Sequence, residues 1–187
     1  TMMFQRADPT PSDPMLGSFY GLALPLLKAG VPVEVVQLEN AGYADALTRY
    51  NMLMLTYEHQ KPLKPEYHDA LAAWVRGGGC LLLVDDGSDP YHNVREWWND
   101  QARKPAKAYD PLLRTLGVDA GVWDRAVPVE KGFVRAIASS PAKLTYMNDG
   151  PELVRSWVKE LLALRGEPFQ MAPGICIRRG PYVIASV

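Results

Sequence analysis

Two groups of polar and aromatic residues each end a strand-like apolar run of the sequence. The first group closes the run NMLMLTY (51–57), and the second follows CLLLV (80–84). Its members are Tyr57, Glu58 and His59 in the first case, and Asp85, Asp86, Asp89, Tyr91 and His92 in the second. Open α/β sheets bind ligands at the carboxyl ends of their parallel strands, so we expect both groups to face one crevice there.

The chemistry that such a crevice can carry out depends on whether its carboxylates are available to a ligand or are used within the loop itself. Carboxylates beside a histidine can hold a divalent cation, bind a ligand or exchange protons. The same stretch, DDGSDP (85–90), is also typical of a solvated loop that leads into a helix, because Asp, Gly, Ser and Pro each favour turns. Its spacing matches neither a calcium-binding loop nor a zinc signature. We therefore expect no metal, no cofactor and no catalytic residue, and leave ligand binding open.

Three consecutive glycines and a cysteine, at 77–80, resemble catalytic or phosphate-binding features only superficially. A phosphate loop follows a strand and precedes a helix. Gly77 to Gly79 instead follow a helical pattern and precede a strand, which predicts a helix end and a tight turn. A nucleophile stands at the carboxyl end of its strand. Cys80 begins its strand, so we expect it to be a buried free thiol, and we expect the same of Cys176.

Aromatic residues are frequent in the second half of the chain. The sequence holds 5 Trp and 9 Tyr, and beyond Tyr91 the candidates for an interface are Trp97, Trp98, Tyr109 and Trp123. Tyr and Trp bury large areas while keeping a polar atom, which suits subunit contacts and sugar stacking. Packing in the core is the alternative. The pattern predicts a contact surface between about residues 90 and 130. His68, beside Glu66 and Asp69, is expected to be solvated.

Strand-like and helix-like segments alternate along the chain, as a sheet covered by helices requires. We predict an α/β protein with a flavodoxin-like, doubly wound, mainly parallel sheet, helices on both faces and a C-terminal antiparallel hairpin. Apolar runs predict strands at 2–5, 31–38, 51–57, 80–86, 131–139 and 142–147, with the hairpin at 174–187. Helical spacing and caps predict helices at 17–30, 43–50, 64–79, 93–104, 109–118 and 149–166.

The bulk composition narrows the class of protein. The 187 residues are 48% apolar and 22% charged, with a net charge of −1. We expect one domain over residues 1–187, without nucleic acid or membrane partners, because the chain lacks basic clusters and long apolar runs. Both ends read as strands, which suggests excision from a longer chain. The compartment is left open.

A resemblance runs through residues 15–90. The sequence FYGLALPLLKAGVPVEVVQLE, the strand YNMLML and the segment ALAAWVRGGGCLLLVDD follow one another as in class I glutamine-amidotransferase-like domains. Among these, the chain is most similar to the trimerisation domain of family 42 β-galactosidases and related multidomain carbohydrate-active proteins. The resemblance implies other domains of the same parent chain, a homo-oligomer and carbohydrate as candidate partners.

The chain departs from active amidotransferases at the catalytic positions. Those enzymes carry Gly-x-Cys-x-Gly after the strand, whereas this chain has Asp85 or Asp86 in place of the cysteine. No His-x-Glu follows, since His92 is the last histidine. The resemblance therefore implies a non-catalytic accessory domain of a glycoside hydrolase type of protein, serving oligomerisation or shaping a neighbouring active site. A sugar-binding or small-molecule-binding module, and a hydrolase centred on Asp85 and Asp86, are the alternatives.

Overall fold

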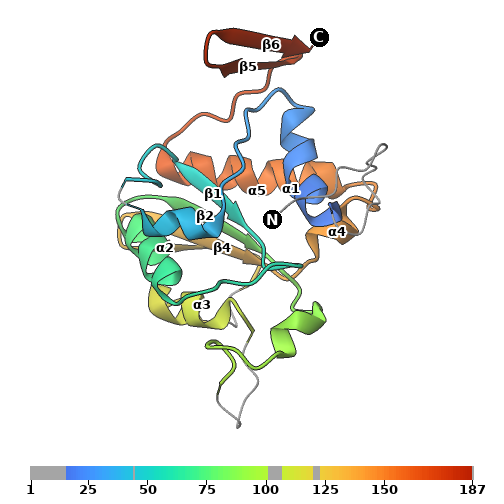
Figure 1. Ribbon diagram of the computed structural model, residues 1–187. Helices are drawn as coiled ribbons and strands as arrows, with labels where there is room; N and C mark the ends of the chain where they lie inside the picture. The colour runs from blue at the N-terminus through green and yellow to red at the C-terminus, as the bar shows by residue number, and fades with distance from the viewer. Residues whose placement is uncertain (1–15, 44, 101–106, 120–122, 187) are drawn as a thin grey trace.

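A four-stranded mixed sheet forms the centre of the protein (Figure 1). The computed structural model describes residues 16–43, 45–100, 107–119 and 123–186. The strands are β1 (Met52–Leu55), β2 (Cys80–Val84), β3 (Ala126–Val129) and β4 (Gly132–Ile137), in the order β1-β2-β4-β3. β1, β2 and β4 run parallel, and β3 pairs antiparallel with β4. The predicted α/β class with a mainly parallel sheet is confirmed.

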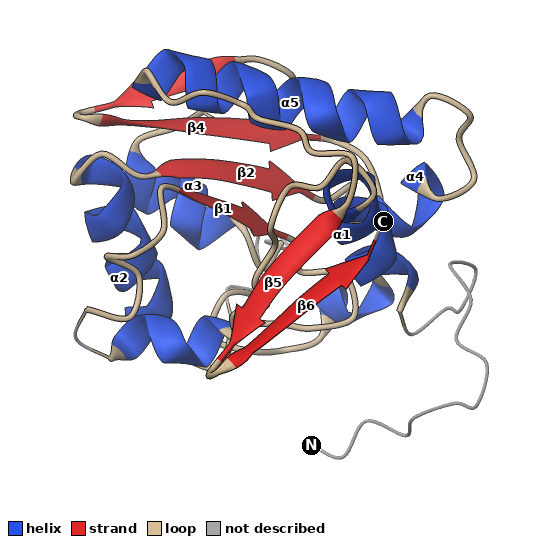
Figure 2. Cartoon of the chain, turned by 90° about the horizontal axis from the view of Figure 1, so that it is seen from above, coloured by secondary structure: helices blue, strands red, loops and turns tan. Residues whose placement is uncertain are grey.

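Helices cover both faces of this sheet (Figure 2). On one face, α2 (Glu66–Arg76) and α3 (Asp110–Leu116) pack against alternate strand residues such as Leu81 and Leu83. On the other face, α1 (Gly17–Leu27) and α5 (Gly150–Arg165) pack against Cys80, Leu82 and Val84. All five residues of β2 are buried, as its uninterrupted apolar sequence requires. The core is therefore two apolar layers separated by the sheet.

The glycines after α2 have the structural role expected from their position. Gly77 ends the helix, and Gly78 has a φ of +120°, a conformation that few other residues adopt. A Cβ on Gly79 would overlap the ring of Trp74. The three glycines thus allow the chain to turn directly from α2 into β2, at the amino end of the strand and away from the carboxyl edge.

Several predicted helices and strands are wrong, because local features of the chain favour a different structure at each place. Residues 31–37 form no ladder, and Leu38–Gly42 is a 3₁₀ helix, η1, because Pro32 and the turn region after it limit pairing. Residues 45–49 are turns, and Asp45 has a positive φ. The predicted strand 142–147 is helix α4 (Pro141–Leu144) with a following turn, since the Ser140 hydroxyl caps it by accepting from the Lys143 N–H. The strand predicted at 2–5 lies outside the described residues.

The predicted helix 93–104 is also absent over the residues that are described. The 3₁₀ helix η2 (Pro90–Asn93) ends at the first residue of this segment, and bends and turns follow it up to residue 100. Its two tryptophans are fixed by distant carbonyls: Trp97 donates to Pro62 O at 2.8 Å and Trp98 to His92 O at 3.5 Å. Tertiary contacts outweigh the helical spacing here.

The chain closes on an antiparallel hairpin, β5 (Ile175–Arg179) and β6 (Tyr182–Ser186), as predicted. Cys176 lies in this hairpin and is exposed, so its expected burial is wrong, whereas Cys80 is buried and donates to Leu161 O. α5 turns Val154, Trp157, Val158 and Leu161 toward the core. Among the described residues, no helix has the length and apolar character that spanning a membrane would need.

Candidate functional site

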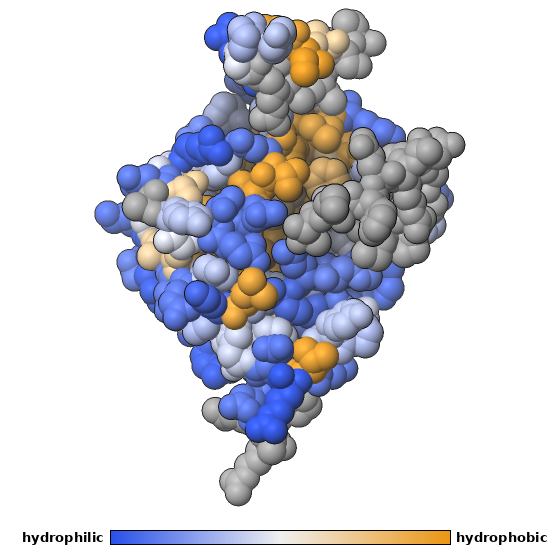
Figure 3. All heavy atoms as spheres, in the orientation of Figure 1, coloured by the Kyte–Doolittle hydropathy of each residue, from blue (hydrophilic) through white to orange (hydrophobic). Residues whose placement is uncertain are grey.

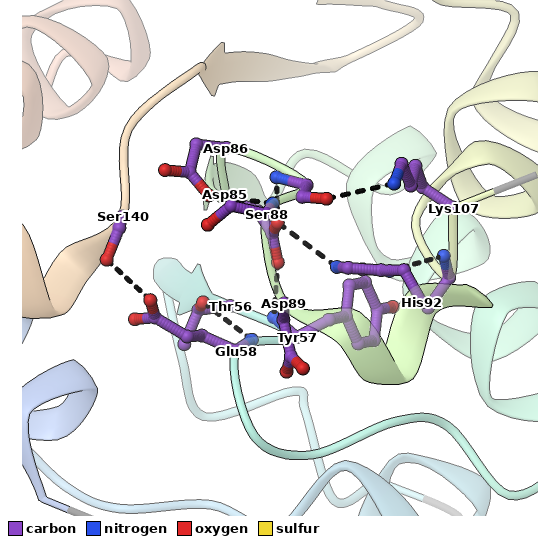
Figure 4. Close-up of polar contacts among 12 residues, drawn as sticks. Thr56, Tyr57, Glu58, Asp85, Asp86, Ser88, Asp89, His92, Lys107 and Ser140 are labelled. Carbon is purple, nitrogen blue, oxygen red and sulfur yellow. Dashed lines mark hydrogen bonds and ion pairs between the residues drawn. The ribbon is translucent and has the colours of Figure 1, made fainter. Parts of the chain in front are cut away.

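The carboxyl ends of the three parallel strands meet at one edge of the sheet, and polar residues gather there (Figure 4). Tyr57, Glu58 and His59 follow β1, the 85–92 loop follows β2, and Ser140 follows β4. Two backbone hydrogen bonds join the first two groups directly. The Tyr57 N–H donates to Asp85 Oδ2 at 3.1 Å, and the His59 N–H donates to Asp89 Oδ2 at 2.6 Å. The two groups of residues therefore lie together at this edge.

Asp85 is a buried acceptor with its hydrogen-bonding capacity in use. It is 3% exposed. Oδ1 accepts from the Gly87 N–H at 2.7 Å and from His92 Nε2 at 3.2 Å, while Oδ2 accepts from Tyr57. Every neighbour is a donor, so the carboxylate holds the 85–92 loop against the end of β1. This geometry belongs to a structural anchor.

His92 is fully buried and has partners on both ring nitrogens. Its Nδ1 accepts from the Ala108 N–H at 3.0 Å, so the ring proton lies on Nε2 and faces Asp85. The Tyr109 ring meets the imidazole edge-on. The histidine therefore links the 85–92 loop to the residues that begin α3, and neither nitrogen is free to exchange a proton with a substrate.

Asp89 forms a buried ion pair that no sequence pattern indicates. Lys61 Nζ lies 2.7 Å from Asp89 Oδ2, and both side chains are almost fully buried. Burial alone would raise the pKa of Asp89, but hydrogen bonds from Lys61 and from the N–H groups of Tyr91 and His59 hold that pKa at about 2. His59 adopts a φ of +64° to make its bond. Asp89 is therefore ionised, and the positive charge of Lys61 balances its negative charge.

Glu58 connects three segments that are distant in sequence. The hydroxyls of Ser18 and Ser140 donate to its carboxylate at 2.6 and 2.5 Å, and the Ala142 N–H donates at 3.2 Å. The carboxylate thus stabilises the first turn of α4, where backbone N–H groups lack internal partners. The two serines were missed by the sequence analysis because a single serine in a loop carries no distinguishing pattern.

The outer rim of the edge carries lysines. Lys143 Nζ lies 2.5 Å from Asp86 Oδ2, and Lys107 Nζ donates to Gly87 O at 2.9 Å. Burial would raise the pKa of Asp86, but Lys143 and hydrogen bonds from Ser88 lower it on balance. Lys107 precedes α3 and Lys143 lies in α4, and no spacing in the sequence indicated that both would contact this loop. The rim therefore carries one ion pair, Asp86–Lys143, whose lysine is largely exposed, and a second lysine bound to a backbone carbonyl.

A second buried polar pair lies behind the edge. Tyr57 Oη and His68 Nε2 are 2.6 Å apart, and Trp97 meets the imidazole edge-on. Burial lowers the pKa of His68 to about 4, and burial with the nearby Asp85 charge raises that of Tyr57 well above its ordinary value. The expected solvation of His68 is wrong: it is 2% exposed, because Trp97 and Tyr57 cover it. Its Nδ1 has no partner among the described residues.

The aromatic residues proposed as a contact surface divide between core and surface. Trp98 and Tyr109 are buried in the protein's own core, which corrects their assignment to an interface. Trp97 and Trp123 are half-buried against the same core cluster. Tyr91 is 60% exposed, at the start of the loop that Asp89 anchors. Tyr91 alone among these five presents most of its ring to solvent.

Two further observations bear on what the edge can bind. In the described part of the chain, no three His, Cys, Asp or Glu side chains are placed to hold a metal ion. A shallow surface pocket of about 370 Å³ lies elsewhere, beside the amino end of β1, where Val35, Tyr43 and Arg49 are among its lining residues. It shares no residue with the carboxyl edge.

Comparisons of the chain with protein-family models, with curated proteins and with solved structures found no match.

Proposed function

We propose that the chain is a non-catalytic, amidotransferase-like accessory domain of a larger carbohydrate-processing protein of the glycoside hydrolase type. Its duty there is oligomerisation or the shaping of a neighbouring active site. We also propose that its sheet is a doubly wound, flavodoxin-like one, which is supported by three parallel strands with helices on both faces. The resemblance in residues 15–90 supports the amidotransferase-like class of the domain. The hydrogen bonding of the acids at the carboxyl edge argues against catalysis.

The observation that carries the proposal is the internal use of the edge acids. Asp85, Asp89 and Glu58 each accept at least three hydrogen bonds from the chain itself. An acid that catalyses must instead reach a substrate with a free oxygen. By the resemblance, Asp85 or Asp86 stands in place of the amidotransferase nucleophile. The burial of Asp85 as an anchor gives no support to a hydrolase centred on these two acids.

The test has two parts. Ammonia release from glutamine by the isolated chain should stay at background. Release that a Cys80→Ala substitution abolishes would overturn the non-catalytic part. For the accessory part, the protein encoded by the complete reading frame is compared with a version lacking this chain. Loss of the native oligomer, or a change in glycoside hydrolysis, is expected. Unchanged assembly and unchanged hydrolysis would refute the proposal.

A sugar-binding module remains the second candidate because of one observation. The exposed Tyr91 ring lies next to Asp89, and the Asp86–Lys143 pair flanks the same loop. An aromatic face beside charged hydrogen-bonding groups suits a sugar ring. Titration with galactosides, followed by NMR, tests this candidate. Binding that is lost in Tyr91→Ala and kept in Tyr43→Ala, another exposed ring that lines the surface pocket away from the carboxyl edge, would favour it.

A further inference from the structure

The C-terminal hairpin stands apart from the body of the protein. β5 and β6 pair with each other from Ile175–Ser186 to Arg179–Tyr182, and among the described residues they form a separate two-stranded sheet. Figure 1 shows the hairpin above the body, at the end of the segment that follows α5, and Figure 2 looks down on it from above. Within the described ranges neither strand has a second partner, so both outer edges of the hairpin are open.

An isolated two-stranded hairpin is at best marginally stable in water. This one also exposes large apolar side chains: Tyr182, Val183 and Ile184 are 71%, 58% and 57% exposed. Figure 3 shows apolar surface on the hairpin above the largely polar lower half of the molecule. Three consecutive residues on a strand point alternately to both faces, so apolar surface is present on both. The hairpin gains stability if something extends or covers it.

The two open edges differ in charge. β5 contains two consecutive arginines in its sequence, Arg178 and Arg179, and Arg178 is exposed. β6 reads YVIAS and contains no charge, no proline and no glycine. Charged residues and prolines are the devices by which proteins protect an edge strand from pairing with another chain. The β5 edge has such protection, and the β6 edge has none.

We propose that β6 pairs antiparallel with β6 of a second copy of this chain, so that two hairpins form one four-stranded sheet across a two-fold axis. The inference deepens the proposed accessory function, on which it rests, by naming the partner and the surface. A strand centred on Ile184 pairs with itself over its whole length: Ile184 faces Ile184, Val183 faces Ala185 and Tyr182 faces Ser186. No like charges become neighbours, whereas pairing of β5 with β5 would bring arginines together.

A two-fold contact of this kind satisfies both hairpins at once, because the same surface serves both copies. The ladder supplies partners to the free N–H and C=O groups of both β6 strands. The joined sheet also has twice the apolar area of one hairpin on each of its two faces. The body of each copy stays outside the contact, as the projection of the hairpin allows (Figure 1). The carboxyl edge is then free in both copies.

The first experiment measures the mass of the 187-residue chain by sedimentation equilibrium over a range of concentrations. The wild type is expected to dimerise. Ile184→Lys places two like charges opposite each other at the axis and should weaken the dimer by about tenfold or more. Val35→Lys, at another exposed apolar residue on the body, is the matched control and should leave the dimer unchanged. Circular dichroism checks that each variant keeps the fold.

The second experiment tests the register. In a Cys176→Ser background, Ile184→Cys should form a disulfide-linked dimer on mild oxidation, because directly paired strand residues have Cα atoms within disulfide range. Val35→Cys in the same background should not. A monomeric wild type, or cross-linking at 184 no faster than at 35, would overturn the inference. If Ile184→Lys still dimerises as the wild type does, the hairpin pairing is wrong although oligomerisation as a function stands.

Discussion

At the scale of single residues, the carboxyl edge is an anchored polar network. Asp85 holds the end of β1, the 85–92 loop and His92 together, and Glu58 holds α1, the loop after β1 and α4. Each anchor is a carboxylate surrounded by donors. The stability of the protein should fall when a buried acceptor is lost and change little when an acid on the solvent side is altered. The 85–92 loop contains an acid of each kind.

The neighbouring acids Asp85 and Asp86 should respond differently to the same change. Asp85→Asn places an amide NH₂ against groups that are all donors and is expected to lower the free energy of unfolding by about 2–3 kcal/mol. Asp86→Asn keeps an oxygen for the Ser88 N–H and releases only Lys143, which is largely exposed, so about 0.5 kcal/mol is expected. Urea unfolding measures both. Equal effects would show that Asp85 is not the anchor.

His68 should make the protein sensitive to acid. Its folded pKa of about 4 lies below the ordinary value of 6.5, so the unfolded chain binds the proton first. The stabilisation is complete above pH 6.5 and is lost as the pH falls toward 4, by about 2 kcal/mol between pH 8 and pH 5. His68→Gln keeps an acceptor for Tyr57 without titrating there. Unfolding in urea at the two pH values should show a smaller loss for this variant, and an unchanged loss would contradict the assignment.

The residues of the edge could be found from the sequence, but not their partners. Glu58, His59, Asp85 and Asp89 follow apolar runs that must end at one edge of a parallel sheet, and this topological rule is enough to place them. Lys61 and Ser140 come from loops, and Ser18 and Lys143 from the first turns of α1 and α4, and no local pattern determines where these segments lie relative to the edge. Without those partners the sequence leaves the acids with several roles, and only the geometry distinguishes an anchor from a catalyst.

At the scale of elements, backbone segments approach one another closely where β4 begins. A Cβ on Gly132 would overlap the carbonyl oxygens of Val75 and Gly79, that is, backbone at the end of α2 and the start of β2. Because backbone cannot move aside as a side chain can, this single position sets how near β4 comes to the α2–β2 turn.

Gly132→Ala is therefore expected to lower the free energy of unfolding by about 3 kcal/mol. Gly117, which ends α3 with a φ of +70° and open space around it, is the comparison. Gly117→Ala introduces only the left-handed conformation of a non-glycine residue, which costs about 1 kcal/mol. Thermal and urea unfolding of both variants give the difference. A larger loss at 117 than at 132 would refute the steric argument.

The elements that the sequence predicted well are those with strong local patterns. β2 is a continuous apolar run, α2 and α5 combine helical spacing with a terminal glycine, and the hairpin has an Arg-Gly-Pro turn. The failures are short segments whose apolar residues fit either period. In 142–147, the Ser140 cap and Pro141 favour a helical turn. In 93–100, the tryptophans pack where their indole N–H groups can donate to backbone carbonyls.

At the scale of the whole molecule, the protein has a body with two apolar layers and a hairpin outside it. Helices already cover both faces of the body's sheet, so association has to use helix surfaces, sheet edges, loops or the hairpin. Of these, the hairpin combines open backbone edges with consecutive exposed apolar residues. The carboxyl edge contributes internal anchoring instead.

The strand order also fixes a sequence of events during refolding. β1 and β2 are joined by one helix, whereas β2 meets β4 only after the long segment between Val84 and Gly132 has been drawn in, which costs more chain entropy. We expect the unit from β1 to β2 to form first and β4 to join it afterwards. In pulse-labelled hydrogen exchange, the amides of Leu82 and Val84, which face β1, should be protected before those of Phe133 and Arg135, which face β2. Simultaneous protection would mean that the segment closes before the sheet begins.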